Sequence, residues 1–250
     1  MKKIIFCFIF LFSVVTALYG EEYQEPISKY KQNYFIFGNS EDQTKFQLSL
    51  KADIIYPFNT GFLFGYTQTT WWKVYNGADT MSSNYQPEVF FRVESKKNIF
   101  GNADLGYIDY FQISPFYHCS TGVEGVDHRS INLYYAQIQM SIGERFNIGD
   151  NFKVFGYYNK SSQNPDIEKY KGYYENDIFA KIFSSVVPFI EFHFKHGGTL
   201  NKGWLACELQ TVLFTDKFQP KLFFQYFYGY GENMVFYNKK EKSFYAGLIF

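Results

Sequence analysis

The sequence has no excess of either charge, since 24 Lys and Arg residues balance 24 Asp and Glu residues. Without a basic field to hold phosphates, the chain is not expected to bind nucleic acid. It has only three cysteines, which are too few for a disulfide framework and match no zinc-site spacing. Disorder is also excluded, because 23% of the residues are aromatic and can bury a large surface.

Long apolar runs are missing beyond the N-terminus, which argues against a helical membrane protein. The one such run, residues 4–18, follows two lysines and ends at small residues before the polar stretch that begins at Glu21. It is short of the roughly 20 apolar residues that a spanning helix needs. We therefore expect residues 1–20 to be an export signal peptide rather than a retained anchor, and the weakly patterned residues 21–44 to be a periplasmic lead-in.

The sequence instead alternates between apolar and polar residues. The alternation is strict over residues 45–54 and returns at 132–142, 190–195 and 244–250. Such segments run about ten residues, the length of a tilted strand that crosses a bilayer, and tyrosine and tryptophan crowd their ends. With the export signal, these features favour an all-β fold over residues 45–250, a transmembrane antiparallel up-and-down β-barrel of about twelve strands. The alternative is a soluble β-sandwich, which also alternates.

Breaks in the alternation predict the turns and one irregular strand. Clusters of Gly, Asn, Asp and Pro predict turns at, among others, 149–151, 164–166 and 197–198. Pro115 interrupts the alternation that leads into His118, and a proline inside a strand indicates a β-bulge or an edge.

Three polar residues form a candidate catalytic group. His118 and Ser120 share one face of a candidate strand, because side chains two residues apart point the same way. Asn132 opens the next strand, so a hairpin could bring it beside His118. Its alternation with the following residues places Asn132 on the lipid-facing side, where a polar side chain is costly without a partner or a task. The His-x-Ser spacing alone is a weak signal.

Short blocks that support a family resemblance follow one another over most of residues 45–250. They are Lys45-Phe46-Gln47-Leu48-Ser49, Gly65-Tyr66-Thr67-Gln68 with Trp71-Trp72, Asn84-Tyr85-Gln86-Pro87-Glu88, His118-x-Ser120-x-Gly122, Arg129-Ser130-x-Asn132, Asn164-Pro165-Asp166-Ile167 with Tyr170-x-Gly172-Tyr173-Tyr174, and Tyr228-Gly229-Tyr230-Gly231-Glu232. In this order and spacing, the chain resembles the outer membrane phospholipase A family of Gram-negative bacteria. The resemblance implies a barrel in the cell outer membrane that is active as a calcium-dependent homodimer.

The resemblance also implies the chemistry of the site. Ser120 is expected to attack the acyl ester of a phospholipid or lysophospholipid, at either acyl position, while His118 takes its proton and Asn132 orients the imidazole. A neutral amide suits a lipid-facing wall better than a carboxylate. The backbone N–H of Ser120 is the expected first donor of the oxyanion hole, and Gly122 is expected to let the next loop approach closely.

One calcium ion per active site is implied as well. The family's carbonyl ligand falls on Val123. This ligand is a backbone oxygen, so a residue of any type can supply it. Its hydroxyl ligand falls on His128, and an imidazole is a poor ligand for a cation that prefers oxygen. We expect carboxylates from Asp127, Glu124 or Asp79 to replace the missing hydroxyl groups.

Gln68 is a second polar residue expected on the lipid face, where an amide seeks a partner. The matching glutamine of the family lies across the dimer interface, which implies that Gln68 contacts a second copy of the chain. The alternative is a bond to a tyrosine or a lipid headgroup. Two rival functions also remain: a non-catalytic outer-membrane pore or structural barrel with a polar lumen, and a surface adhesin, which needs longer loops.

Overall fold

The computed structural model describes residues 27–39, 43–55, 59–73, 79–98, 106–121, 128–143, 146–182, 189–212 and 220–250. Its elements are β1 (Ile27–Lys29), β2 (Tyr34–Gly38), β3 (Gln43–Ile55), β4 (Thr60–Lys73), β5 (Asp79–Asn98), β6 (Tyr107–Thr121), β7 (Ser130–Ile142), β8 (Phe146–Lys160), α2 (Glu168–Lys171), β9 (Tyr174–Ile182), β10 (Ile190–Gly197), β11 (Trp204–Val212), β12 (Lys221–Tyr230) and β13 (Lys240–Ile249). Within these ranges, no helix has the length and apolar character to cross a membrane.

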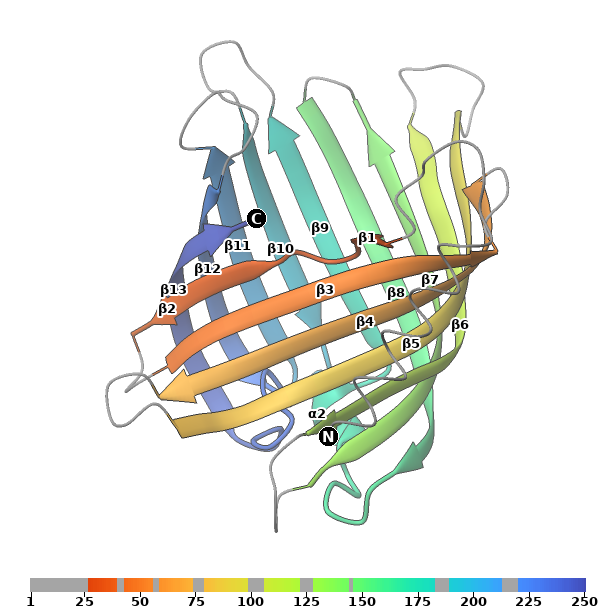
Figure 1. The fold of residues 1–250 in the computed structure, drawn as a ribbon. Coiled ribbons are helices and arrows are strands. Elements are labelled where there is room, and N and C mark those ends of the chain that lie inside the picture. The colour runs from red at the N-terminus through yellow and green to blue at the C-terminus, as the bar shows by residue number, and fades with distance from the viewer. Residues whose placement is uncertain are drawn as a thin grey trace.

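Strands β2 to β13 form a closed antiparallel barrel of twelve strands, in which each strand pairs with its neighbours along the chain (Figure 1). The ring closes where β2 pairs with β13. This closing ladder holds five residue pairs, whereas the β12–β13 ladder holds ten. The predicted up-and-down barrel is confirmed.

The barrel begins earlier than the predicted boundary at residue 45. β2 pairs with both β3 and β13, and β1 pairs with the far half of β3, so residues 27–39 belong to the wall and lumen rather than to a separate lead-in. The reason lies in the sequence Tyr34–Gly38, which is almost wholly apolar and only five residues long. Such a run shows no period of two. The predicted signal peptide lies outside the described residues.

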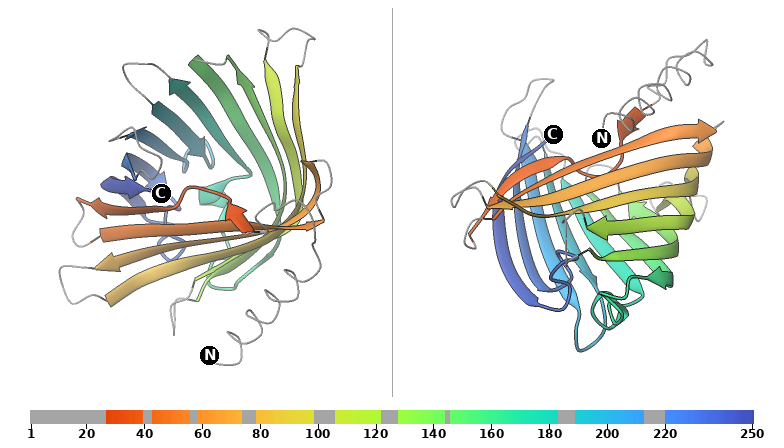
Figure 2. Two further views of the ribbon diagram at one scale, coloured as in Figure 1. Left: turned by 45° about the horizontal axis from the view of Figure 1, so that its top comes forward. Right: turned by 60° about the horizontal axis from the view of Figure 1, so that its bottom comes forward.

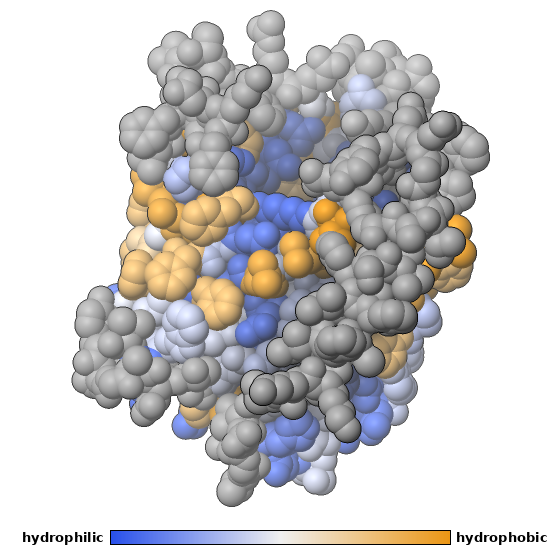
Figure 3. Space-filling model, viewed as in Figure 1, coloured by the Kyte–Doolittle hydropathy of each residue, from blue (hydrophilic) through white to orange (hydrophobic). Residues whose placement is uncertain are grey.

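The two faces of the wall differ in polarity (Figure 3). Large apolar side chains that stand exposed on the outer face include Phe62, Ile113, Tyr134, Phe192 and Phe244. Buried polar side chains that point inward include Lys45, Glu88, Arg92, Glu208 and Gln225, around a central cavity of about 540 Å³. Apolar outside and polar inside is the pattern of a barrel surrounded by lipid.

Polar side chains on the lumen side pair along β10 and between β10 and its neighbours β9 and β11. His193 on β10 lies with Nδ1 2.8 Å from the Asp177 carboxylate and Nε2 2.9 Å from that of Glu191. Lys195 donates to Glu208 at 2.6 Å. Both ring nitrogens of His193 are therefore engaged in hydrogen bonds to carboxylates. Among the described residues, no group of three or more His, Cys, Asp or Glu side chains could hold a metal ion.

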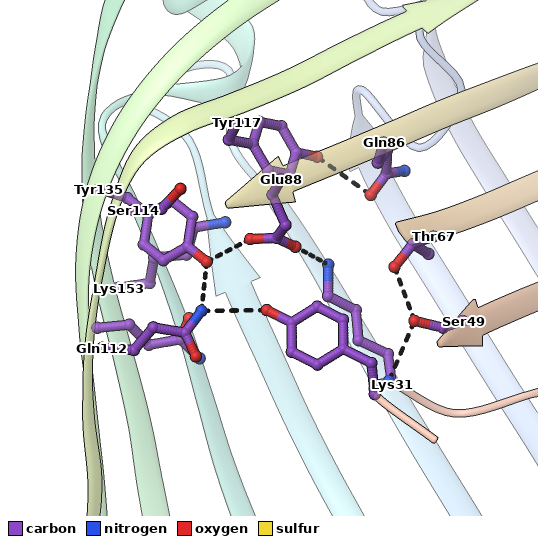
Figure 4. Close-up of polar contacts among 12 residues, drawn as sticks. Lys31, Ser49, Thr67, Gln86, Glu88, Gln112, Ser114, Tyr117, Tyr135 and Lys153 are labelled. Atoms are coloured by element: carbon purple, nitrogen blue, oxygen red, sulfur yellow. Dashed lines mark hydrogen bonds and ion pairs between the residues drawn. The ribbon is translucent and has the colours of Figure 1, made fainter. Parts of the chain in front are cut away.

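The chain between β1 and β2 leaves the wall and enters the lumen (Figure 4). The Lys31 ammonium lies 3.5 Å from the Glu88 carboxylate on β5, and the Tyr30 hydroxyl accepts a hydrogen bond from Gln112 on β6 at 3.1 Å. Tyr135 on β7 hydrogen-bonds to both Glu88 and Gln112. The N-terminal segment thus supports β5, β6 and β7 from inside.

The turn predicted at residues 149–151 is wrong, since these residues lie inside β8. Gly149 faces the lumen, where a Cβ would stand 2.1 Å from the Phe179 ring. The glycine therefore makes room for a neighbouring aromatic ring and does not mark a turn.

Candidate functional site

A β-bulge in β6 decides which way the candidate catalytic side chains point. Before the bulge Gln112 and Ser114 are fully buried on the inner face. The register then shifts between Ser114 and Tyr117, so two residues of β6 face one residue of β7. After it, Tyr117 is buried in turn, and His118 takes the outer face that an unbroken alternation would deny it. The irregularity predicted at Pro115 is confirmed.

His118 and Asn132 meet across the β6–β7 ladder. They are directly opposite each other in register, and His118 Nδ1 lies 2.7 Å from Asn132 Oδ1. Thr121 N–H donates to the Arg129 carbonyl at 2.9 Å further along the ladder. This bond makes the His118–Asn132 pair one of the non-hydrogen-bonded pairs, in which side chains of opposite strands approach most closely.

The contact also assigns the protons of the His118 ring. The Asn132 amide oxygen can only accept, so Nδ1 must carry the hydrogen. In the neutral imidazole Nε2 is then left with a free lone pair. The arrangement holds the ring in the tautomer that a general base requires.

Ser120 lies two residues from His118 on the same strand and the same outer face. Among the described contacts, no hydrogen bond joins its hydroxyl to the His118 ring. Ser120 stands between Tyr85 on β5 and Ser130 on β7 in the register. Sequence reasoning did not place these two residues beside Ser120; both occur in the quoted blocks, but only the strand register brings them together.

Two turns pack into the barrel behind this part of the wall. Ile167, from the turn before α2, and Met234, from the turn between β12 and β13, are buried against the inner side chains Cys119 and Leu133. Cys119 Sγ lies 3.4 Å from Met234 Sδ. Cys119 therefore faces inward, on the opposite side of β6 from His118, and the described turns occupy the lumen at the end of the barrel that carries the candidate site (Figure 2).

A side-chain hydrogen bond also joins the same two turns to each other. Tyr237 donates to Asp166 at 2.6 Å. Burial and this hydrogen bond raise the pKa of Tyr237 to about 12. The Tyr237 hydroxyl therefore keeps the proton that it donates throughout the physiological pH range, and the two turns stay joined to each other.

Gln68 lies on β4, opposite Tyr85. Its amide oxygen accepts from the Tyr66 hydroxyl at 3.1 Å, and its nitrogen donates to Thr70 at 3.2 Å. Both partners lie on β4 itself. The bond to Tyr66 fits the alternative expectation, in which Gln68 bonds to a tyrosine. Since Tyr85 in turn stands opposite Ser120, Gln68 is in the same cross-strand row as the candidate nucleophile.

The described residues do not by themselves form a calcium site. Gly122, Val123, Glu124 and Asp127 lie outside the described residues, and so does the side chain of Asp79, which begins β5. His128 has its Nδ1 3.1 Å from the Thr121 carbonyl oxygen. An imidazole held in this way does not replace an oxygen ligand.

Comparisons with known proteins agree with this architecture. A putative phospholipase A1 of Neisseria meningitidis is 28% identical over 83% of the chain, and phospholipase A1 of Escherichia coli K12 is 26% identical over 84%. The chain spans 54% of the length of the first relative and 70% of the second.

Solved structures share the fold. Outer membrane phospholipase A from Escherichia coli has a TM-score of 0.75 at 22% identity, covering 89% of this chain and 97% of that one. The Salmonella typhi outer membrane phospholipase dimer with bound calcium has a TM-score of 0.77 at 22% identity, covering 92% and 94%. The family model for phospholipase A1 matches residues 8–250, and the chain belongs to this family.

Proposed function

We propose that the chain is an outer-membrane phospholipase that hydrolyses acyl ester bonds with Ser120, His118 and Asn132. The observation that supports this best is the 2.7 Å contact between His118 and Asn132 on the outer wall, with Ser120 on the same face. A polar pair exposed to lipid is costly unless it has a task. In this position acyl chains reach it directly from the membrane.

The residues divide the reaction as follows. Nε2 of His118 takes the proton of the Ser120 hydroxyl as Oγ attacks the ester carbonyl, and an acyl-enzyme forms as the alcohol leaves with that proton. Water then attacks the acyl-enzyme, with His118 again as the base, and releases the fatty acid. Asn132 keeps Nδ1 protonated throughout, so that Nε2 remains the nitrogen that accepts.

The strand register indicates where the ester oxygen would be held. Ser120 and Ser130 form another non-hydrogen-bonded pair of the β6–β7 ladder, so the Ser120 N–H points toward β5. Tyr85 is the register partner of Ser120 on that side, so an oxyanion that receives this N–H would have to compete with the Tyr85 carbonyl. Gly122 remains the proposed position for close approach of the following loop.

A dimer and calcium form part of the same proposal. A second copy that covers Gln68 would cover the row that leads through Tyr85 to Ser120, which ties dimerisation to the substrate side of the site. The Salmonella typhi relative is a dimer with bound calcium. We propose Val123, Asp127 and Asp79 as the ligands here. Phospholipids, and lysophospholipids as a second class, are the proposed substrates, cleaved at either acyl position.

The rival pore function finds less support. A pore needs an open lumen, whereas two described turns, with Ile167 and Met234, pack into the lumen at one end. Tyr30 and Lys31 enter it from the N-terminal segment. The remaining cavity of about 540 Å³ is lined by side chains that pair with one another.

The test is phospholipid hydrolysis by detergent-purified protein, with calcium or a chelator, for wild type and Ser120→Ala. We expect release of fatty acid and lysophospholipid by wild type only, and Ser130→Ala as the matched control should retain activity. Products resolved by acyl position distinguish A1 from A2 cleavage. Activity that survives in Ser120→Ala removes the proposed nucleophile, and an inactive wild type that conducts ions in bilayers supports the pore.

A further inference from the structure

The strand that faces the proposed nucleophile begins with a backbone N–H that has no backbone acceptor among the described contacts. Ser130 is the first residue of β7 and stands opposite Ser120 in a non-hydrogen-bonded pair, so its N–H and C=O both point away from β6 and toward β8. The β7–β8 ladder, however, ends at the pair Ile131–Lys160. Beyond that pair, Ser161, the first residue after β8, donates its N–H to the Ser130 carbonyl at 2.9 Å, which leaves the Ser130 N–H without a backbone acceptor among the described contacts.

The side chain of Asn164 supplies the acceptor for this N–H and a second donor to the Ser130 carbonyl. Its Oδ1 accepts from the Ser130 N–H at 3.3 Å, and its Nδ2 donates to the Ser130 carbonyl at 3.1 Å. An amide side chain carries one acceptor and one donor group, as a backbone peptide does, so it can continue a β-ladder by one position.

Asn164 is itself held firmly. It is fully buried, with 0% of its surface exposed, and its own N–H donates to the Ser161 carbonyl at 3.1 Å. The next residues, Pro165 and Asp166, lead to Ile167, which is buried in the cluster behind Cys119. A rigid turn thus carries the amide to the end of β7.

We propose that Asn164 is a positioning residue for the hydrolytic site, and this rests on the function proposed above. By completing the hydrogen bonds of Ser130, it fixes the first rung of the β6–β7 ladder, where Ser120 stands, relative to the rung of His118 and Asn132. Displacement of a reacting group by about 1 Å can cost a hundredfold in rate. The Asn-Pro-Asp turn therefore acts on catalysis without touching substrate.

The experiment compares Asn164→Ala with Asn233→Ala in the full-length protein. Asn233 is a matched control, because it is also a buried amide of these turns, at 3% exposed, but bonds to Ser82 on β5 and not to Ser130. We expect kcat for a short-chain ester in detergent to fall about tenfold to a hundredfold in Asn164→Ala, with KM within about twofold. Asn233→Ala should keep kcat at a similar loss of thermal stability.

Two further measurements keep the proposal testable apart from folding and from the function itself. Asn164→Asp keeps the oxygen that accepts from Ser130 N–H but cannot donate to the carbonyl, so its kcat should lie between wild type and Asn164→Ala. Amide hydrogen exchange of the Ser130 N–H should become faster in Asn164→Ala and stay unchanged in Asn233→Ala, whether or not the enzyme is active.

The outcomes separate the two proposals. An unchanged kcat in folded Asn164→Ala, an equal fall in Asn233→Ala, or unchanged exchange at Ser130 overturns the positioning role. An inactive wild type with faster exchange in Asn164→Ala overturns the hydrolase and leaves Asn164 only a structural role.

Discussion

Asn132 and His118 face each other in a non-hydrogen-bonded pair of adjacent strands, with Oδ1 and Nδ1 2.7 Å apart on the outer wall of the barrel. On a lipid-facing surface neither group has water as a reliable partner, so each lowers the cost of exposing the other. The pair therefore persists before any substrate arrives.

Removal of this contact should slow hydrolysis with little effect on the barrel. In Asn132→Ala the His118 ring loses the acceptor that fixes its tautomer, and we expect kcat to fall about 10²-fold to 10⁴-fold. The rate of short-chain ester hydrolysis in detergent measures this. Asn159→Ala, on the neighbouring strand opposite Asn132, is the control and should keep the wild-type rate.

The extra residue of the bulge in β6 should account for the outward direction of His118 and Ser120. Deletion of Pro115 removes that residue and joins the Ser114–Tyr135 pair to the Tyr117–Leu133 pair without a shift, so a regular ladder would keep His118 on the outer wall. We therefore expect the deletion variant to migrate as a folded barrel in unheated gel samples and to retain activity, as Pro115→Ala should. Loss of activity in a deletion variant that still folds contradicts the parity argument.

Gln68→Ala should weaken the proposed dimer. Loss of an interhelical or interstrand amide contact in lipid costs about 0.6 to 2 kcal/mol, enough to lower the crosslinked fraction several-fold near the dissociation constant. Chemical crosslinking in detergent with substrate analogue measures this fraction. Tyr66→Phe removes one of the two intrastrand partners of Gln68, leaves Thr70 in place, and serves as the control. An unchanged dimer in Gln68→Ala assigns the amide to its own strand.

Calcium removal should abolish activity reversibly, because the proposed site depends on the ion. We expect chelation to inactivate wild type and added calcium to restore it, and Asp127→Asn to need a higher calcium concentration, because the neutral amide is the weaker ligand for a hard cation. Calorimetry of the purified dimer provides the affinity. Absence of calcium binding together with full activity in chelator contradicts the prediction.

Much of the architecture could be predicted from the sequence because each face of a barrel wall has a single environment, lipid on the outside and a polar lumen on the inside. Side chains therefore alternate along each strand. Alternation over 45–54 and 132–142 gave the strands, and the hairpin between His118 and Asn132 placed their side chains near each other. Local signals failed where long-range packing decides. Gly149 reads as a turn residue, yet it makes room for Phe179 of the next strand.

The candidate site was harder to predict in its details. Period two alone gives Ser114 and Ser120 the same face, whereas the bulge separates them onto opposite faces. Pro115 signals an irregularity, but not its size in residues. Asn164 reads as part of a turn, since only the three-dimensional arrangement brings its amide to the open end of β7.

The closure of the barrel has a consequence for its assembly. The final ladder joins β2 to β13, about two hundred residues apart, and its closure costs the largest chain entropy although it holds only five pairs. The cylinder can shut only after the end of the polypeptide is available. Unzipping under denaturant or force should therefore start between these two strands, while their ten-pair neighbour β12–β13 is still intact.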